Sequence, residues 1–152
     1  FKSIALCDTA SRYPAGAAEV WAARVKTATE QGLEPLVAPT LERWFTEGYR
    51  KAQPEKVARI ANMIRETPVA GYAGCCAALP KIDATDRLKE IRCPALVVCG
   101  EQDMGTPLAL SQAIHAAMPG SELVVIPDAA HISNLEQPEA FTAALERFLA
   151  RA

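Results

Sequence analysis

The chain has 152 residues, half of them apolar, and its 16 Lys and Arg residues against 18 Asp and Glu residues give a formal net charge of −2. This length suits one ordinary domain of about 100–200 residues with a buried core. Since Lys and Arg do not cluster, the chain lacks the basic stripe that binding to nucleic acid or to an anionic membrane requires, and a small molecule is the expected partner.

The first third of the chain predicts a strand followed by helices. Ser3 to Asp8 is an apolar run that leads directly into a loop, which is typical of a strand from the middle of a sheet. Ala18 to Gln31 carries apolar residues at helical spacing, and Gly32 is placed to end that helix. Because the chain opens on Phe1 in such a strand, we expect preceding strands to be absent, as in a fragment or one piece of a nicked chain.

The middle of the chain continues as a helical module. Pro54 suits a first helical position, and the apolar residues that follow recur at helical spacing until Thr67-Pro68 stops the run. We divide the sequence into a core strand and loop (1–14), a helical module (15–80) and a C-terminal part (81–152).

The C-terminal part alternates strands and helices. Ala95 to Cys99 is a continuous apolar run, as expected of a parallel strand buried on both faces. Thr106-Pro107 predicts a helix cap and a first helical proline, with the helix running to about Met118. Glu122 to Ile126 predicts the next strand, and Pro138 opens a last helix whose inward residues are Phe141, Ala144, Leu145 and Phe148. We expect an α/β fold with a βαβα unit in a mostly parallel sheet.

The sequence has no pattern typical of a membrane span, a signal peptide or a metal site. The apolar stretches are far shorter than the roughly 20 residues that span a bilayer, and the start lacks a signal-peptide pattern. We therefore expect a cytoplasmic protein. The five cysteines, two of them adjacent at Cys75 and Cys76, match neither a disulfide framework nor a Cys-x-x-Cys metal pattern. We expect reduced core residues, no metal site and no cysteine nucleophile, because none has the flanking glycines of a nucleophile elbow.

Two polar residues, Asp103 and His131, each follow a buried strand of the predicted sheet. Since the carboxyl ends of parallel strands meet at one edge, their side chains should come within reach of a hydrogen bond. Taken singly, Asp103 suits a loop or cap and His131 a hydrogen-bonded loop residue. Together, in this order, they predict the acid and the base of a catalytic triad, in which the carboxylate orients the imidazole. The nucleophile is missing, because no Gly-x-Ser-x-Gly segment occurs.

The last 60 or so residues resemble the α/β-hydrolase superfamily, through Gly100 to Asp103, Thr106-Pro107, His131 and Glu136 to Phe141. Ala129-Ala130 departs from the common Gly-x-Gly-His approach to the histidine. The chain is similar at a finer level to the 3-oxoadipate enol-lactonases of the β-ketoadipate pathway of aromatic degradation. The stretches that carry this similarity are Asp8–Arg12, Ala18–Trp21, Leu41–Phe45 and Arg65–Ala78.

This resemblance implies that residues 15–80 form the lid of a serine-type hydrolase that opens an enol lactone bearing a free carboxylate. A serine outside this chain would attack the ring carbonyl, with His131 as general base and Asp103 as its orienting acid, and no metal or organic cofactor would be needed. Arg12 and Trp21 are the expected substrate-binding residues, although Arg12 could instead pair with a surface acid and Trp21 could pack the lid. For Trp44 and Phe45 we favour lid packing.

Two other functions stay open. Another α/β-hydrolase, such as a carboxylesterase or a C–C bond hydrolase, could use the same Asp103 and His131. A non-catalytic binding protein could have kept the fold without the chemistry, since fold does not imply function. The residue at the missing nucleophile position decides between enzyme and binding protein.

Overall fold

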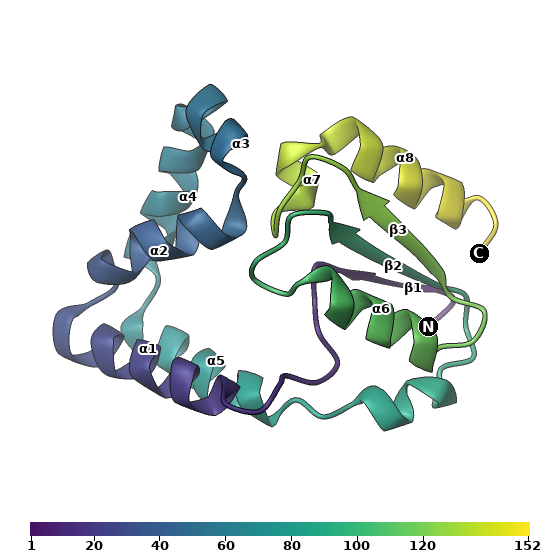
Figure 1. The fold of residues 1–152 in the computed structure, drawn as a ribbon, viewed down its shortest axis with the longest axis horizontal. Coiled ribbons are helices and arrows are strands. Elements are labelled where there is room, and N and C mark those ends of the chain that lie inside the picture. Colours follow the sequence, from purple (N-terminus) through teal and green to yellow (C-terminus); the bar gives the residue numbers. More distant parts are fainter. The chain divides into compact units, whose positions relative to one another are not determined.

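The computed structural model describes all 152 residues, Phe1–Ala152. Its three strands are β1 (Ile4–Cys7), β2 (Ala95–Gly100) and β3 (Glu122–Ile126). Its helices, shown in Figure 1, are α1 (Ala17–Gln31), α2 (Glu34–Trp44), α3 (Glu47–Ala52), α4 (Pro54–Glu66), α5 (Val69–Ala78), α6 (Leu108–Ala117), α7 (Ser133–Glu136) and α8 (Pro138–Leu149), with short 3-10 helices η1 (Leu79–Lys81) and η2 (Thr85–Glu90).

Contacts divide the chain into two compact units. The first, here called the strand unit, comprises Phe1–Ser11, Arg43–Thr46 and Ala84–Ala152. The second, here called the helical unit, comprises Arg12–Glu42 and Glu47–Asp83. The short segment Arg43–Thr46 therefore belongs to the strand unit although the residues on both sides of it belong to the helical unit. The three-part division made from the sequence stays a prediction.

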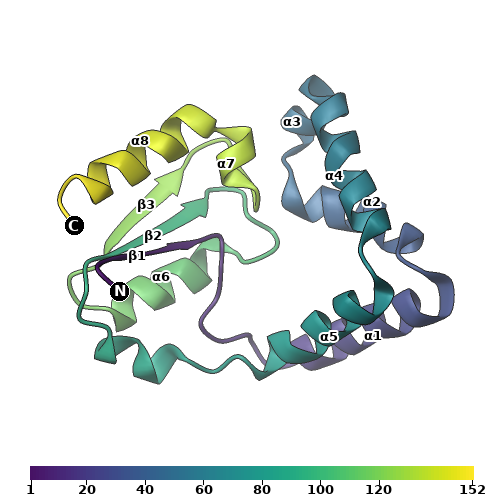
Figure 2. The ribbon, with the colours of Figure 1, turned by 180° about the vertical axis from the view of Figure 1, so that it is seen from behind.

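The strand unit is built on a parallel sheet of order β1-β2-β3. Cys7 pairs with Val98, and Val98 pairs with Val124. Helices α6 and α8 cover opposite faces of the sheet, as Figures 1 and 2 show from the two sides. This arrangement confirms the predicted parallel sheet, and the α/β-hydrolase fold class agrees with it.

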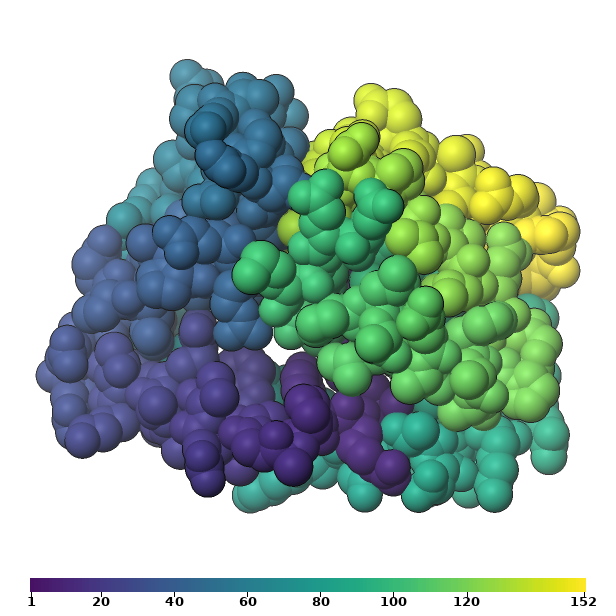
Figure 3. Space-filling view, in the orientation of Figure 1, coloured from purple at the N-terminus to yellow at the C-terminus, as the bar shows by residue number.

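Strand β2 is the centre of the core, because every one of its residues is buried. Side chains of a strand alternate between faces. Ala95 and Val97 accordingly pack with Ile114 of α6, whereas Leu96 and Val98 pack with Phe148 of α8. Figure 3, in the orientation of Figure 1, shows the green surface of α6 on the near side of the strand unit. A strand buried on both faces is expected to be a continuous apolar run, and the sequence of β2 has this pattern.

The helical unit contains α1, α3, α4, α5, η1 and most of α2. Its core joins Ala28, Leu33 and Leu36, with Tyr72 packed against them. The helix expected from Pro54 is confirmed, with the proline in its first turn. Gly32 ends α1 as predicted, and its φ of 78° explains why glycine suits that position. None of the helices combines the length and the apolar composition that a membrane-spanning helix needs.

Two details differ from the sequence-based expectations. Helix α6 begins at Leu108, after Pro107, and no side chain caps it. The hydroxyl of Thr106 is not available as a cap, because it donates to the carboxylate of Asp103. All five cysteines are free, as expected, but only Cys76 and Cys99 are buried, and Cys75 is exposed.

Candidate active site

The carboxyl ends of β2 and β3 bring Asp103 and His131 together. Asp103 lies in the loop after β2, and His131 lies in the loop after β3. Oδ2 of Asp103 is 3.0 Å from Nδ1 of His131. The contact predicted from the two strand ends is therefore confirmed, and the distance is that of a hydrogen bond.

The carboxylate of Asp103 is fixed from several sides. Its side chain is fully buried, with an exposed fraction of 0%. Oδ1 accepts the backbone N–H groups of Gly105 (2.7 Å) and Thr106 (2.9 Å), and Oδ2 accepts the hydroxyl of Thr106 (2.9 Å). Burial alone would raise the pKa of Asp103, but its hydrogen bond with His131, the charge of His131 and the bonds from Thr106 outweigh burial and lower that pKa. Asp103 is thus an ionised acceptor of fixed orientation.

The imidazole of His131 is set up to take a proton at its other nitrogen. An ionised Asp103 accepts only, so Nδ1 carries the proton of the shared hydrogen bond. This leaves the lone pair on Nε2, which has no hydrogen-bond partner in the structure. The side chain of His131 is 21% exposed, so a reacting group can reach it. An imidazole whose Nδ1 is bound to a carboxylate and whose Nε2 can accept a proton has the chemistry of a general base.

Gly105 makes this close contact possible. A β-carbon added at Gly105 would lie 2.8 Å from Nδ1 of His131 and 3.2 Å from Oδ1 of Asp103. Both distances are shorter than ordinary van der Waals contacts. Glycine at this position therefore lets the loop after β2 pass directly beneath the imidazole.

A second carboxylate, Asp8, lies at the end of β1. Its Oδ1 accepts the backbone N–H of Gly100 (2.9 Å), and its Oδ2 accepts the hydroxyl of Ser133 (2.6 Å). Burial raises the pKa of Asp8, and the nearby charge of Asp103 adds to the rise, despite the opposing bonds and the charge of His131. Through its hydrogen bonds to Gly100 and Ser133, Asp8 connects β2 to α7, the helix after His131. The sequence analysis gave Asp8 no role, although it follows a strand just as Asp103 does.

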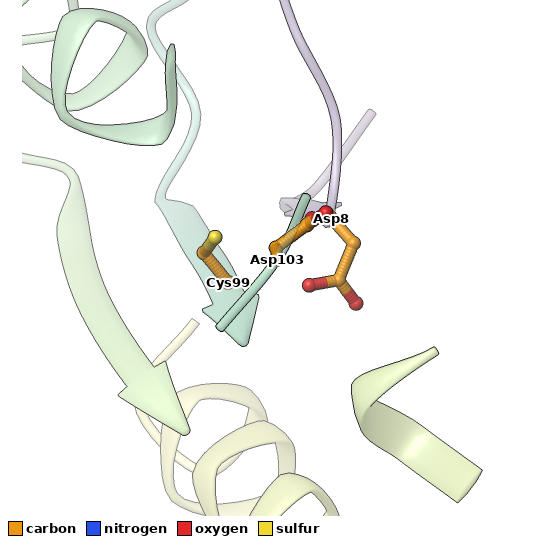
Figure 4. A group of neighbouring side chains, drawn as sticks. All are labelled: Asp8, Cys99 and Asp103. Carbon is orange, nitrogen blue, oxygen red and sulfur yellow. The ribbon is translucent and has the colours of Figure 1, made fainter. Parts of the chain in front are cut away.

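Asp8, Cys99 and Asp103 each offer a potential metal-ligand atom, and these atoms lie within 4.8 Å of one another (Figure 4). Their chemistry does not suit a metal. Both carboxylates already accept hydrogen bonds from neighbouring protein donors. Burial raises the pKa of the Cys99 thiol to about 11, so the thiolate that binds metals is scarce at neutral pH. We interpret the cluster as a hydrogen-bonded network.

Trp44 lies beside the imidazole, a contact that the sequence analysis missed. The rings of Trp44 and His131 are 6.0 Å apart between centroids and tilted by 33°. The carbonyl of Trp44 accepts the backbone N–H of Ile132 (3.2 Å). Phe45 is buried, with 1% exposed, as packing would require. Trp44 therefore forms one wall beside the candidate base, in place of the lid packing expected for it.

Glu136 joins the Trp44 segment to the His131 loop. Its Oε1 accepts the backbone N–H (2.9 Å) and the hydroxyl (2.7 Å) of Thr46, and its Oε2 accepts the backbone N–H of Ala130 (2.6 Å). Only a carboxylate can accept on both oxygens. The side chain is buried, with 7% of the residue exposed. Glu136 thus fixes the backbone at Ala130, next to His131, and at Thr46, two residues after Trp44.

Replacing Glu136 with Gln should destabilise the protein by about 1–3 kcal/mol. The amide N–H₂ of Gln only donates, so one of the buried donors that Glu136 now accepts from would lose its hydrogen bond. The loosened contact should also change the surroundings of the His131 imidazole. Urea denaturation and the NMR signals of the His131 ring measure these two effects. The matched control is Glu139→Gln, an exposed position on α8 that should change neither quantity. Equal behaviour of the two variants would contradict the positioning role of Glu136.

Arg12 and Trp21, the two residues expected to bind substrate, lie in the helical unit. Nε of Arg12 forms an ion pair with Oδ1 of Asp83 at 2.5 Å, with both side chains largely exposed. Trp21 meets Tyr13 edge to face, with 6.2 Å between ring centroids, and the guanidinium of Arg24 lies 5.8 Å from its ring centroid. The substrate-binding roles of Arg12 and Trp21 stay predictions.

Comparisons with known proteins match the whole chain. A family model described as the alpha/beta hydrolase family matches residues 2–144. The chain is 37% identical over 151 residues to 3-oxoadipate enol-lactonase 2 of Acinetobacter baylyi, covering 99% of this chain and 55% of that protein. It superimposes on the enol-lactonase of Burkholderia xenovorans LB400 with a TM-score of 0.94 at 35% identity, covering 99% of this chain and 57% of the other.

A third comparison is with a thermophilic esterase from Thermogutta terrifontis, solved with malate bound. The TM-score is 0.90 at 30% identity, covering 99% of this chain and 56% of the esterase chain. This chain thus spans about half the length of the relatives that it matches.

Proposed function

Because the chain belongs to the alpha/beta hydrolase family, we propose that it is the C-terminal portion of a serine-type ester or lactone hydrolase. The observation that carries this proposal is the 3.0 Å contact between a fully buried Asp103 carboxylate and Nδ1 of His131. No Gly-x-Ser-x-Gly segment occurs in the chain. The nucleophile and the oxyanion hole therefore come from residues outside it.

The proposed mechanism uses His131 twice. Nε2 of His131 first takes the proton of the serine hydroxyl as the oxygen attacks the substrate carbonyl, while Asp103 stabilises the imidazolium. His131 then returns the proton to the leaving oxygen. In the second half, Nε2 takes a proton from water as the water oxygen attacks the acyl carbonyl, and it returns that proton to the serine oxygen as the acid is released. Backbone N–H groups outside this chain would stabilise the oxyanion.

We propose 3-oxoadipate enol-lactone as the substrate and 3-oxoadipate as the product, in the breakdown of aromatic compounds in the cytoplasm. The 37% and 35% identities to two enol-lactonases support this choice. The leaving group would be an enol, which becomes a ketone after it is protonated. A broad carboxylesterase is the second candidate, supported by the 30% identical esterase. That esterase was solved with malate bound, and malate carries carboxylate groups, as the proposed lactone carries one.

The full-length protein should prefer the enol lactone over phenyl acetate in kcat/KM. A charge-assisted contact to the free carboxylate is worth about 1.5–3 kcal/mol, which corresponds to roughly 10–150-fold. Steady-state kinetics on both substrates test this expectation. Faster hydrolysis of phenyl acetate would favour the carboxylesterase. Turnover of neither substrate, with a residue other than a nucleophile at the elbow, would favour a binding protein.

A further inference from the structure

Asp8 is a half-buried acid that the fold holds beside a second acid. An oxygen of the Asp8 carboxylate and an oxygen of the Asp103 carboxylate lie within 4.8 Å of each other (Figure 4). Two negative charges at this distance repel each other, and partial burial makes the repulsion stronger than in water. Burial and the charge of Asp103 both raise the pKa of Asp8. The negative charge of Asp8 is therefore unfavourable for the fold.

The backbone at Asp8 adds a second cost. Its φ is 44°, in the left-handed region that residues other than glycine seldom occupy. The backbone N–H of Asp8 donates to the carbonyl of Val98 (2.8 Å), which fixes the residue at the end of β1. Strained backbone and half-buried charge are found together most often at functional sites. The combination at Asp8 therefore requires a reason beyond packing.

The hydrogen bonds of Asp8 do not supply that reason, because a neutral amide could make them. Oδ1 accepts the backbone N–H of Gly100 (2.9 Å), and the oxygen of Asn would accept it equally well. Oδ2 accepts the hydroxyl of Ser133 (2.6 Å). A hydroxyl can turn and accept from the N–H₂ of Asn instead. The geometry around Asp8 thus needs a planar polar group but not a negative charge.

The cation that the charge of Asp8 meets is His131 in its protonated form. The charge of His131 lowers the pKa of Asp8, in opposition to burial and to Asp103. This attraction is mutual, so an ionised Asp8 stabilises a protonated His131 in turn. Two other titratable groups lie in this region. Cys99 is a neutral thiol, since burial raises its pKa to about 11, and Glu136 accepts from Thr46 and Ala130.

We infer that Asp8 is a positioning residue whose negative charge stabilises the imidazolium that His131 becomes when it takes a proton. The inference rests on the proposed function, in which Nε2 of His131 takes the proton of the nucleophile. Asp103 orients the ring by a direct hydrogen bond, whereas Asp8 acts on the ring through its charge. Asp8, Asp103 and His131 all belong to the strand unit, so the inference uses no contact with the helical unit.

The first test is an NMR titration of the His131 ring in the full-length protein with labelled histidine, in the absence of substrate. The signals are assigned by their loss in His131→Gln. Asp8→Asn keeps both hydrogen bonds and removes the charge. At a given pH it should lower the ratio of protonated to neutral His131 roughly three- to thirtyfold, the range for the loss of one partly screened unit charge. An unchanged ratio in Asp8→Asn would overturn the inference.

Two further variants separate the charge from other effects. Asp128→Asn is the matched control, because Asp128 also has a left-handed φ, of 53°, but is exposed. Water screens an exposed charge, so this variant should change the ratio by less than about twofold. Ser133→Ala removes a hydrogen bond to Asp8 and keeps the charge, and it should also leave the ratio nearly unchanged. A fall in Ser133→Ala as large as that in Asp8→Asn would assign the effect to the hydrogen bond and contradict the inference.

Thermal melts distinguish this role from that of a structural anchor. Because the folded protein raises the pKa of Asp8, the ionised carboxylate lowers stability at pH values above its ordinary pKa. Asp8→Asn should therefore have a Tm at pH 7 equal to or above that of the unaltered protein. A lower Tm with an unchanged His131 ratio would show an anchor. If Asp8→Asn does not fold, Asp8→Gly, which suits a φ of 44°, should give the same fall in the ratio.

The NMR ratio also separates this inference from the proposed hydrolase. If Asp8→Asn lowers the ratio but the full-length protein hydrolyses no ester or lactone, the hydrolase proposal fails and the effect of Asp8 on His131 stands. If the protein hydrolyses esters and the ratio is the same in Asp8→Asn as in the unaltered protein, the hydrolase proposal stands and the role of Asp8 is wrong.

Discussion

Asp103→Asn should lower kcat of the full-length protein by about 10³–10⁴-fold with little loss of stability, because a triad whose acid becomes an amide holds the wrong histidine tautomer. Asn keeps the shape of Asp103, and its oxygen can still accept the N–H groups of Gly105 and Thr106. Its N–H₂ would then replace Oδ2 and face Nδ1 of His131 and the hydroxyl of Thr106, and that hydroxyl can turn and accept a hydrogen bond. Nδ1 would have to accept, so the proton would move to Nε2, and the lone pair needed to deprotonate the nucleophile would be lost.

The measurement is hydrolysis of 4-nitrophenyl butyrate by the variant, with a thermal melt to confirm folding. The control is Asp128→Asn in the loop before His131. Asp128 is exposed and has a φ of 53°, a conformation that Asn tolerates. It should keep normal activity. If Asp103→Asn retained more than about a tenth of the activity, His131 would not depend on Asp103 for its tautomer, and the triad proposal would be wrong.

The contact between Asp103 and His131 could be predicted from the sequence because it follows from topology. Two successive parallel strands end at the same edge, and each strand was visible as an apolar run, although only β2 is buried throughout and β3 is mostly half-buried. The same reasoning applied to Asp8 after β1 would have found the second carboxylate, so that omission was avoidable. Thr106 was assigned to a helix cap because local sequence cannot show that Asp103 competes for its hydroxyl.

The contacts of Glu136 and Arg24 were beyond such reasoning. Glu136 accepts from Thr46, 90 positions earlier in the chain, and Arg24 donates to Tyr72, 48 positions later. Periodicity predicts which face of a helix is buried, but it does not identify the partner on another helix. Nothing in the sequence around Arg12 and Arg24 indicates that their side chains have different partners. Only their partners, a carboxylate for Arg12 and two hydroxyls for Arg24, distinguish them.

Gly100→Ala should produce the largest loss of stability, about 3 kcal/mol or more, because a methyl group forced into a filled space requires the backbone to shift. A β-carbon at Gly100 would lie 2.1 Å from the carbonyl oxygen of Ala130 and 2.6 Å from that of Ala129. Both obstacles are backbone atoms and cannot rotate away. They belong to the loop that carries His131, so the shift should also separate His131 from Asp103 and lower kcat.

Urea denaturation of the full-length protein measures the loss at Gly100, and Gly48→Ala provides the contrast. Gly48 lies in α3, and a β-carbon there would meet no atom within 4 Å. Since alanine restricts the unfolded chain and favours helix, Gly48→Ala should be neutral or stabilise the protein by up to about 1 kcal/mol. The same substitution should thus have opposite effects at the two sites. A Gly100→Ala protein as stable as the parent would mean that the His131 loop does not pack against the end of β2, and that the site depends on Asp103 and Glu136 alone to hold the imidazole.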